Sequence, residues 1–183
     1  MKTLTMFALA ALLAAPTIAS ADSKTRISDA DLQVMSQMHH VNQVEIDMGK
    51  VAETKGNTAA VKAYGKLLVT DHTSADKDLT ALAKKHGQTI PMFKPTNEAD
   101  QKDDKDDKDM AAHIKTEKGA DFDKDFLSMM VAGHEKVLAK LDSAAGAVKS
   151  DELKEVITNV KPTVQKHADQ ARDLQKTDAV GMR

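Results

Sequence analysis

Residues 61–82 read VKAYGKLLVTDHTSADKDLTAL, with apolar side chains at Val61, Tyr64, Leu68, Ala75, Leu79 and Leu82. Steps of three, four and seven residues return to the same side of an α-helix, so this stretch predicts an amphipathic helix. His72 interrupts the apolar stripe between Leu68 and Ala75. Burial of a polar group without a partner costs roughly 2–7 kcal/mol, so an imidazole in this position needs an explanation.

The same periodicity occurs three more times along the chain. It predicts helices over residues 28–55, 58–86, 121–145 and 151–175. Each of the four apolar stripes includes one ionisable residue, and these residues are Glu45, His72, His134 and His167. One carboxylate and three imidazoles are therefore expected to point into the core from four different helices.

Residues at the expected helix ends support these boundaries. Ser28 or Asp29 can cap the first helix and Thr58 the second, because their side chains can accept hydrogen bonds from free backbone N–H groups. Gly87 is typical of a residue that ends a helix in a left-handed conformation. Pro162 is predicted to kink the last helix.

Residues 88–119 differ from the rest of the chain. They begin with two prolines and continue into the Lys/Asp run 98–109, which is typical of a solvated loop or helix. Met110 and Ile114 predict a short amphipathic helix in the second half. We interpret 88–119 as a long crossover between the helical hairpins 28–87 and 120–175. The fold class is then all-α, a ferritin-like four-helix bundle.

The first residues have the pattern of a secretory signal peptide. Lys2 is followed by an apolar core over residues 4–15 and by the small residues Ala19-Ser20-Ala21, so cleavage is predicted after Ala21. The remaining residues 22–183 form one predicted domain of 162 residues. The predicted location is periplasmic or secreted. The apolar core is too short to span a membrane, and residues 22–183 hold no predicted membrane span.

The composition argues against several classes of function. Without Lys2 the chain has 25 basic and 28 acidic residues, which gives no positive field for nucleic acid. No cysteine is present, so thiolate ligands and disulfides are excluded. No Gly-x-Ser-x-Gly motif indicates a hydrolase, and a non-enzymatic protein is favoured. The sequence names no partner, and it leaves homo-oligomerisation open.

Seven short motifs occur in order along all four predicted helices. They are Asn42-Gln-Val-Glu45, Gly49-Lys-Val-Ala52, Val61-Lys-Ala-Tyr-Gly65, Val69-Thr-Asp71-His72-Thr73, Phe122-Asp123-Lys-Asp-Phe126-Leu127, Met130-Val-Ala-Gly-His134 and Pro162-Thr-Val-Gln-Lys-His167. With these motifs the chain resembles the ferritin-like domain of unknown function of bacterial proteins often named predicted outer-membrane proteins. The resemblance implies an exported four-helix bundle without an established activity. It also implies polar core positions at Glu45, Asp71, His72, Asp123, His134 and His167.

The four stripe residues admit two interpretations. In the first, Glu45, His72, His134 and His167 bind a transition metal such as Fe, Zn or Cu, because imidazole is a good ligand for these ions. A di-iron carboxylate centre is disfavoured, since the chain has no Glu-x-x-His motif. In the second, the chain is a structural or stress-associated interaction module whose buried hydrogen-bond network fixes helix register without a metal.

A count along each hairpin argues against convergence of the four residues. Glu45 lies 11 residues before a turn at Gly56 and His72 lies 16 after it, which separates them by about 7.5 Å along the axis. His134 lies 13 residues before a turn at Ala147 and His167 lies 20 after it, a separation of about 10 Å.

Three weaker metal-ligand candidates accompany these four residues. By the same count His39 is closer than Glu45 to the level of His72, and Asp71 is its neighbour in sequence. Asp123 lies near the start of a helix, where interaction of a carboxylate with the helix dipole is the favoured interpretation.

Methionines next to histidines suggest two further metal centres. Met35 and Met38 precede His39-His40, and Met129-Met130 lie one turn before His134. Thioether and imidazole together favour copper, and Met with His can also ligate haem iron. Methionine at helical spacing is more often a core residue.

Overall fold

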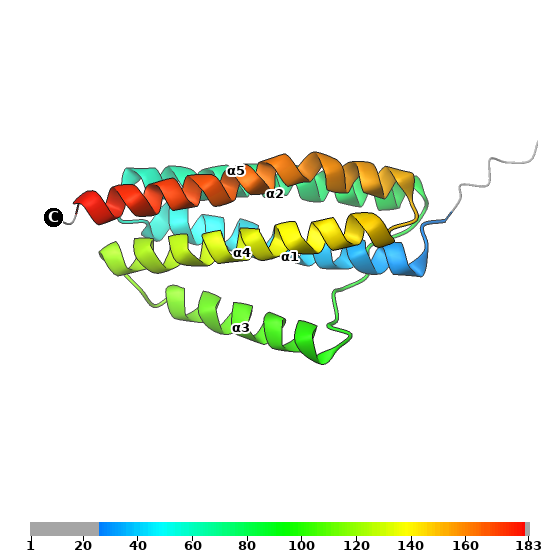
Figure 1. Cartoon of the computed structure of the whole chain (residues 1–183), viewed down its shortest axis with the longest axis horizontal. Coiled ribbons are helices and arrows are strands. Elements are labelled where there is room, and N and C mark those ends of the chain that lie inside the picture. The colour runs from blue at the N-terminus through cyan, green and yellow to red at the C-terminus, as the bar shows by residue number, and fades with distance from the viewer. Residues whose placement is uncertain (1–25, 182–183) are drawn as a thin grey trace, which may run out of the picture.

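The structure, a computed structural model, describes residues 26–181, with side chains up to Thr177. Over this range it consists of five α-helices without strands: α1 (Asp29–Lys55), α2 (Ala59–Lys85), α3 (Glu98–Ile114), α4 (Gly119–Ala147) and α5 (Asp151–Gly181) (Figure 1). The all-α prediction is therefore confirmed. The predicted signal peptide lies outside the described residues.

Four of the helices form a bundle, and the fifth lies beside it. α1 packs along α2, and α4 packs along α5. The two pairs meet mainly through α2 and α5, and α1 also contacts α4. Figure 1 shows α3 outside the bundle, alongside α4, where it connects the two pairs. The ferritin-like classification of this bundle stays a prediction.

The helix starts follow the capping residues of the sequence. Ser28 Oγ accepts a hydrogen bond from the Asp31 N–H at 3.1 Å, and Thr58 Oγ1 accepts one from the Val61 N–H at 3.2 Å. After α2, Gly87 has φ +68°, a left-handed conformation that glycine adopts without strain. Pro162 lies inside α5, and its predicted kink stays a prediction.

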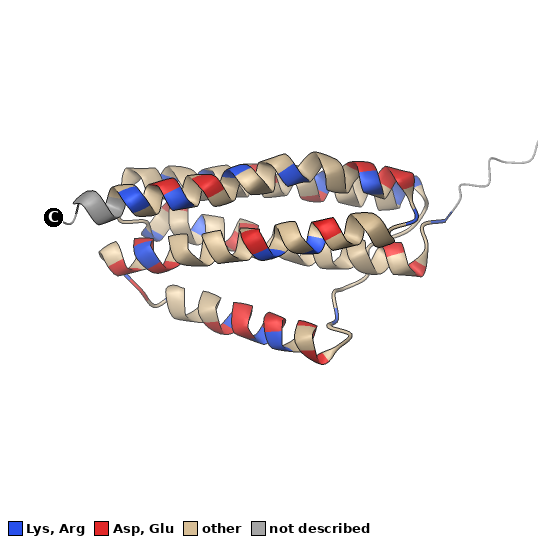
Figure 2. Cartoon of the chain, in the orientation of Figure 1, with Lys and Arg blue, Asp and Glu red and all other residues tan. Residues whose placement is uncertain are grey.

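The charged crossover contains more helix than predicted. α3 begins at Glu98 and includes the whole Lys/Asp run, whereas the sequence predicted a helix only in the second half. The run is helical because its charges alternate at i,i+4, as in the pair Asp104–Lys108 at 2.7 Å. Ile114 is the one buried residue of α3. Figure 2 shows charges of both signs along this helix.

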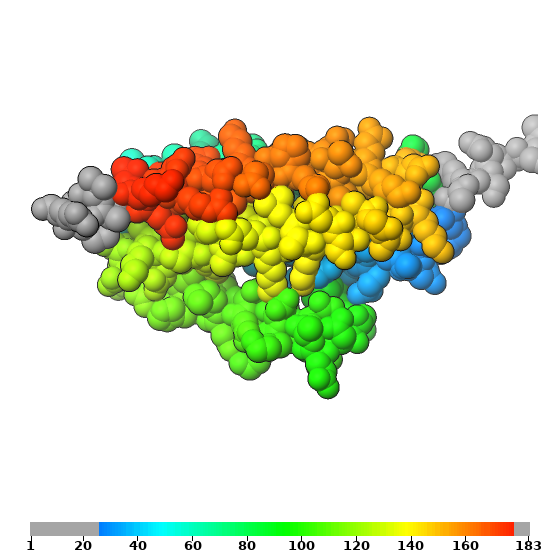
Figure 3. All heavy atoms as spheres, viewed as in Figure 1, coloured from blue at the N-terminus to red at the C-terminus, as the bar shows by residue number. Residues whose placement is uncertain are grey.

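Lysines of α4 hold α3 to the bundle. Lys136 contacts Asp103 and Asp107 at 3.2 and 3.1 Å, and Lys140 contacts Asp103 at 3.2 Å. In Figure 3, side chains of α4 extend down to α3, with openings between them. The charged first part of α3 is thus joined to the bundle by ion pairs, whereas Ala111 and Ile114 near its end pack into the core, which explains why the hydrophobic pattern predicted only its second half.

Close contact between α1 and α2 depends on two glycines. A Cβ added to Gly49 would lie 2.7 Å from the carbonyl oxygen of Gly65, and one added to Gly65 would lie 2.6 Å from that of Gly49. Real Cβ atoms do not approach backbone this closely, so the two helices would have to separate. These glycines therefore set the spacing of the helices that carry Glu45 and His72.

The buried core consists of two apolar clusters. One includes Tyr64, Leu68, Met130 and Ala171, and the other includes Leu79, Leu141 and Val164. The stripe histidines fall between these clusters on three helices: His72 follows Leu68, His134 follows Met130, and His167 follows Val164. A polar layer thus separates the two apolar halves of the bundle.

Candidate metal centre

Three imidazoles converge in the polar layer. One ring nitrogen from each of His72, His134 and His167 lies within 4.8 Å of the other two. Their ring centroids are 5.9 Å (His72–His134) and 5.3 Å (His72–His167 and His134–His167) apart. The rings of His134 and His167 therefore meet, although the residue count placed the two residues about 10 Å apart along the axis.

The register of the helices explains this convergence. His72 is the 13th residue before the end of α2, and His134 is the 13th before the end of α4; these two helix ends lie at the same end of the bundle (Figure 1). His167 is the 16th after the start of α5, because the connection 148–150 contributes no helical rise. The remaining offset between His134 and His167 is three residues, about 4.5 Å, which long imidazole side chains can span.

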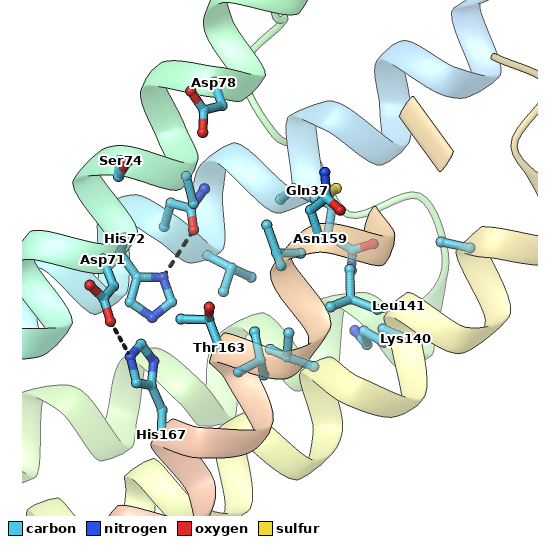
Figure 4. A pocket seen from close by; sticks show the side chains of 18 of the residues that line it. Gln37, Asp71, His72, Ser74, Asp78, Lys140, Leu141, Asn159, Thr163 and His167 are labelled. Carbon is cyan, nitrogen blue, oxygen red and sulfur yellow. Dashed lines mark hydrogen bonds and ion pairs between the residues drawn. The ribbon is translucent and has the colours of Figure 1, made fainter. Parts of the chain in front are cut away.

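Each imidazole uses one ring nitrogen in a hydrogen bond to an oxygen. His72 Nδ1 lies 3.0 Å from Asn42 Oδ1, and His134 Nδ1 lies 2.7 Å from the Met130 carbonyl oxygen. His167 Nε2 lies 2.9 Å from Asp71 Oδ2 (Figure 4). A carbonyl and a carboxylate only accept, so His134 and His167 donate from these nitrogens. The opposite nitrogen of each ring then carries the lone pair.

Those opposite nitrogens have no hydrogen-bond partner. His72 Nε2, His134 Nε2 and His167 Nδ1 are all buried and unpaired. They belong to nearly inaccessible side chains, with His134 1% and His167 0% exposed. Buried polar atoms are paired in the great majority of cases, so three unpaired lone pairs on adjacent rings are unusual. An electrophile such as a metal ion is the partner that would satisfy all three at once.

Backbone contacts hold the ring-bearing segments in place. The Tyr64 hydroxyl donates to the His167 carbonyl oxygen at 3.0 Å, which ties α2 to α5 at the level of the imidazoles. Tyr64 is fully buried, and burial raises the pKa of its phenol, so the hydroxyl keeps its proton. This hydrogen bond therefore fixes the position of the backbone of α5 at His167 relative to α2.

Glu45 lies beside the three imidazoles. It is buried, and one carboxylate oxygen, Oε2, has no hydrogen-bond partner. A Cβ added to Gly133, next to His134, would lie 4.0 Å from Glu45 Oε1, so the carboxylate faces this part of α4. Glu45 does not belong to the group within 4.8 Å. Of the four predicted stripe residues, the structure brings three together and leaves the fourth adjacent.

Burial favours the neutral form of the site. Desolvation lowers the pKa of His72 to about 3, with smaller contributions from His134 and His167. Desolvation also lowers the pKa of His167, although its hydrogen bond to Asp71 opposes this effect. Burial raises the pKa of Glu45, opposed by His134 and reinforced by Asp107 of α3. The lowered pKa values favour neutral rings at His72 and His167, which have lone pairs available for a metal.

The three weaker candidates lie outside the group. Asp71 contacts His167 as an orienting partner, and His39 pairs with Asp76 at 2.6 Å. Asp123 accepts hydrogen bonds from the N–H groups of Asn57 and Thr58 at 2.7 and 2.9 Å. Its carboxylate therefore caps the start of α2. The sequence had suggested a role at the start of its own helix, α4.

Asn42 is a site residue that the sequence reasoning missed. It is buried and contacts His72 because it is the 13th residue before the end of α1, level with His72 on α2. His39, which the residue count favoured as the neighbour of His72, is instead level with Asp76. Asn42 lies three residues before Glu45, on the same side of the helix. This spacing is the signal that could have identified it.

The methionines and adjacent histidines of the copper and haem hypotheses have other contacts. Met35 is fully buried in one apolar cluster and Met130 in the other. His40 stacks on Phe93, with ring centroids 4.9 Å apart. Met35 and Met130 therefore act as core residues, which is the more common role of methionine at helical spacing.

A second group of metal-ligating residues lies at the surface. His113 Nε2 is 3.5 Å from Glu117 Oε1 and 3.6 Å from Asp125 Oδ2, near the turn between α3 and α4. The His113 side chain is 56% exposed. These contacts are explained as surface ion pairs, in contrast to the buried imidazoles.

A cavity adjoins the imidazoles inside the bundle. It has a volume of about 320 Å³ and is lined by residues of α1, α2, α4 and α5. His72 and His167 form part of its wall, together with apolar side chains such as Val137, Leu141 and Val164. Figure 4 shows both imidazoles beside this space.

Among the described residues, none of the helices is long and apolar enough to cross a membrane.

Similar structures share the fold at low sequence identity. CopM in the Cu(I)-bound form is 14% identical, with a TM-score of 0.63 over 80% of this chain and 96% of that one. A DUF305 fragment from Deinococcus radiodurans is 12% identical, with a TM-score of 0.71 over 83% of this chain and 99% of that one. No curated protein matches the chain. The model of the family described as Domain of unknown function (DUF4142) matches residues 16–174, and the chain therefore belongs to the DUF4142 family.

Proposed function

We propose that this chain binds one transition-metal ion through His72 Nε2, His134 Nε2 and His167 Nδ1. Two observations carry the proposal: the three imidazoles converge, with one ring nitrogen of each within 4.8 Å of the others, and each ring has one buried nitrogen without a hydrogen-bond partner. Three donors of one zinc ion lie about 3–4 Å apart, because each zinc–nitrogen bond is about 2.0–2.1 Å long. Small rotations of the rings would bring the three nitrogens to that spacing.

The surroundings of the imidazoles support a bound cation. Metal-ligating histidines usually donate their second ring nitrogen to an oxygen, as His72, His134 and His167 do here. Two carboxylates lie near the rings, Asp71 in contact with His167 and Glu45 beside His134. The negative charge of Asp71 would offset part of the charge of a buried divalent ion, and Glu45, whose neutral form burial favours, would add a second negative charge by losing its proton when the ion binds.

Imidazole ligands favour zinc, copper and iron over magnesium or calcium. Copper is the first of these to test, because CopM, which has a similar fold, has Cu(I)-bound, Cu(II)-bound and silver-bound forms. We propose no catalytic step for the site.

A metal-free structural module is the second candidate. Part of the network it requires is present, in the contacts of Asn42, Asp71 and the Met130 carbonyl with the three rings. A complete network would also satisfy the inner nitrogens, and they have no partner. A bound metal accounts for both nitrogens of each ring: one nitrogen donates to an oxygen, and the other would bind the ion.

We also propose that the protein is exported and that one domain extends over residues 22–183. Support comes from the signal-like pattern from Lys2 to Ala21. Sequencing of the N-terminus of protein isolated from the periplasm would test the export: Asp22 as first residue is expected, and an intact Met1 would contradict export by cleavage.

Metal content decides between the two candidate functions. The purified chain is stripped with chelator and offered Cu, Zn and Fe in separate experiments, and bound metal is measured by elemental analysis after desalting. We expect one ion per chain in the native protein and in His39→Ala, the matched control on α1, and none in His72→Ala. Absence of stoichiometric metal in the native protein, or equal binding by His72→Ala, would contradict the proposal.

A further inference from the structure

We infer that the cavity beside the imidazoles is a binding site for a compact, uncharged, mainly apolar molecule that places one nitrogen donor atom on the bound metal. This inference rests on the proposed function, since the metal is part of the site. It goes further because it assigns a ligand class to a cavity that the metal itself does not fill.

The shape of the cavity favours a small organic ligand. Its volume of about 320 Å³ is at the lower end of the range of small-molecule sites. Of its lining residues, Ser74, Asp78 and Asn159 are exposed and form a polar rim on α2 and α5. His72, Val164 and His167 are buried at the inner end. A ligand that enters at the rim therefore reaches the imidazoles with its far end.

The metal would keep a coordination position for such a ligand. Three protein ligands leave one position of a tetrahedral ion open, as in metal sites that bind exogenous molecules. Two of the three imidazoles, His72 and His167, line the cavity, whereas His134 does not. Because two of the three ligands line the cavity, we place the open side of the ion toward it.

Apart from the ion itself, the wall offers no free positive charge to an anion. Asp71 and Asp78 both line the cavity. Lys140, the basic residue of the wall, contacts Asp100 and Asp103 of α3 at 3.5 and 3.2 Å, so its charge is already compensated. Most of the remaining wall is apolar and gives an uncharged body a favourable environment.

Titration of a metal-loaded protein with an uncharged azole tests the inference. Cobalt(II) replaces the native ion as a visible probe, and 4-phenylimidazole is added at pH 8 while the cobalt absorption bands are followed. We expect a saturable spectral shift for the native chain. Val137→Phe, which fills the cavity, should weaken the azole at least about tenfold while cobalt still binds.

Val131→Phe is the matched control. Val131 lies three residues before His134 and Val137 three after it, and both are half-buried, but Val131 packs against an apolar cluster and does not line the cavity. If Val137→Phe fails to fold, the neighbouring pair Ala144→Leu (in the cavity wall) and Ala145→Leu (outside it) makes the same comparison.

The outcomes separate this inference from the proposed function. Cobalt binding without an azole shift, or with an equal shift in Val131→Phe and Val137→Phe, would overturn the cavity site and leave the metal site standing. Failure of cobalt and of the native metals to bind would overturn the metal site, and the inference with it.

Discussion

Two sets of buried polar residues in this bundle differ in how completely they are paired. Asp31 and Asp123 each use both carboxylate oxygens: Asp31 accepts from the N–H groups of Lys149 and Ser150, and Asp123 from those of Asn57 and Thr58. His72, His134 and His167 each pair one ring nitrogen and leave the other unpaired.

This difference supports different roles for the two sets of polar groups. The two aspartates join each helical pair to a connection of the other, so all their hydrogen-bonding capacity serves the fold. The imidazoles have unused capacity that points at one shared region. A chain that can satisfy buried aspartates this fully has no structural need for three unpaired nitrogens in its centre, which is why we assign them to a ligand.

Replacement of His134 by leucine should have the largest effect on the comparison. With metal at about 1,000 times its Kd, the native protein should gain about 4 kcal/mol of unfolding free energy, and His134→Leu almost none. Without metal, His134→Leu should be at least as stable as the native protein, because it removes a buried unpaired atom. Denaturant unfolding with and without metal measures both. A marked loss of metal-free stability would instead favour the structural network.

Replacement of Asp123 by alanine should lower the stability of the fold and leave metal binding unchanged. It leaves two N–H groups at the start of α2 without an acceptor, and we expect a loss of about 3 kcal/mol of unfolding free energy. Metal affinity of the folded protein should be unchanged. Asp121→Ala, an exposed aspartate of the same helix, is the control and should change stability little. Equal effects of the two substitutions would contradict the capping role.

Replacement of Asp71 by alanine should weaken the site without removing it. Loss of the oxygen that orients His167 is expected to lower metal affinity about 10- to 100-fold, with the fold retained. Asp78→Ala, on the exposed side of α2, should leave affinity nearly unchanged. Competition with a chromophoric chelator measures both variants. An unchanged affinity in Asp71→Ala would contradict the role of Asp71 in orienting His167.

The pH dependence of the metal-free protein should show the smallest effect. His72 is neutral in the folded protein down to a pKa of about 3, whereas an unfolded histidine binds a proton near pH 6.5. Below pH 6.5 the unfolded state therefore binds more protons, and the stability from His72 is lost as the pH falls. Between pH 7 and pH 6 the native protein should lose up to about 1 kcal/mol more than His72→Gln. Parallel pH profiles would contradict the burial of a neutral imidazole.

The four bundle helices could be predicted from the sequence because the signals that define a helix lie close together in the chain. The periodicity around His72 and the capping residues Ser28 and Thr58 act within a few residues, so helix position could be predicted without the fold. The extent of α3 could not be, since its stability depends on charge pairs and on contacts with Lys136 and Lys140 of another helix.

The candidate site was predictable in composition and not in geometry. The stripes identified His72, His134 and His167, but counting from single turn residues misplaced them by several ångströms. The true reference points are the helix ends, and these depend on how residues 148–150 cross between α4 and α5. The contacts of Asn42 with His72 and of Asp123 with the start of α2 join residues far apart in sequence, and no local pattern contains them.

X-ray absorption at the metal edge of the loaded protein tests the central claim most directly. The spectrum reports the number and type of ligand atoms around the ion. We predict one ion per chain with three imidazole nitrogens at about 2.0–2.1 Å. A shell of oxygen or sulfur atoms without imidazole scattering, or one unchanged in His167→Ala, would contradict the assignment of the three buried histidines.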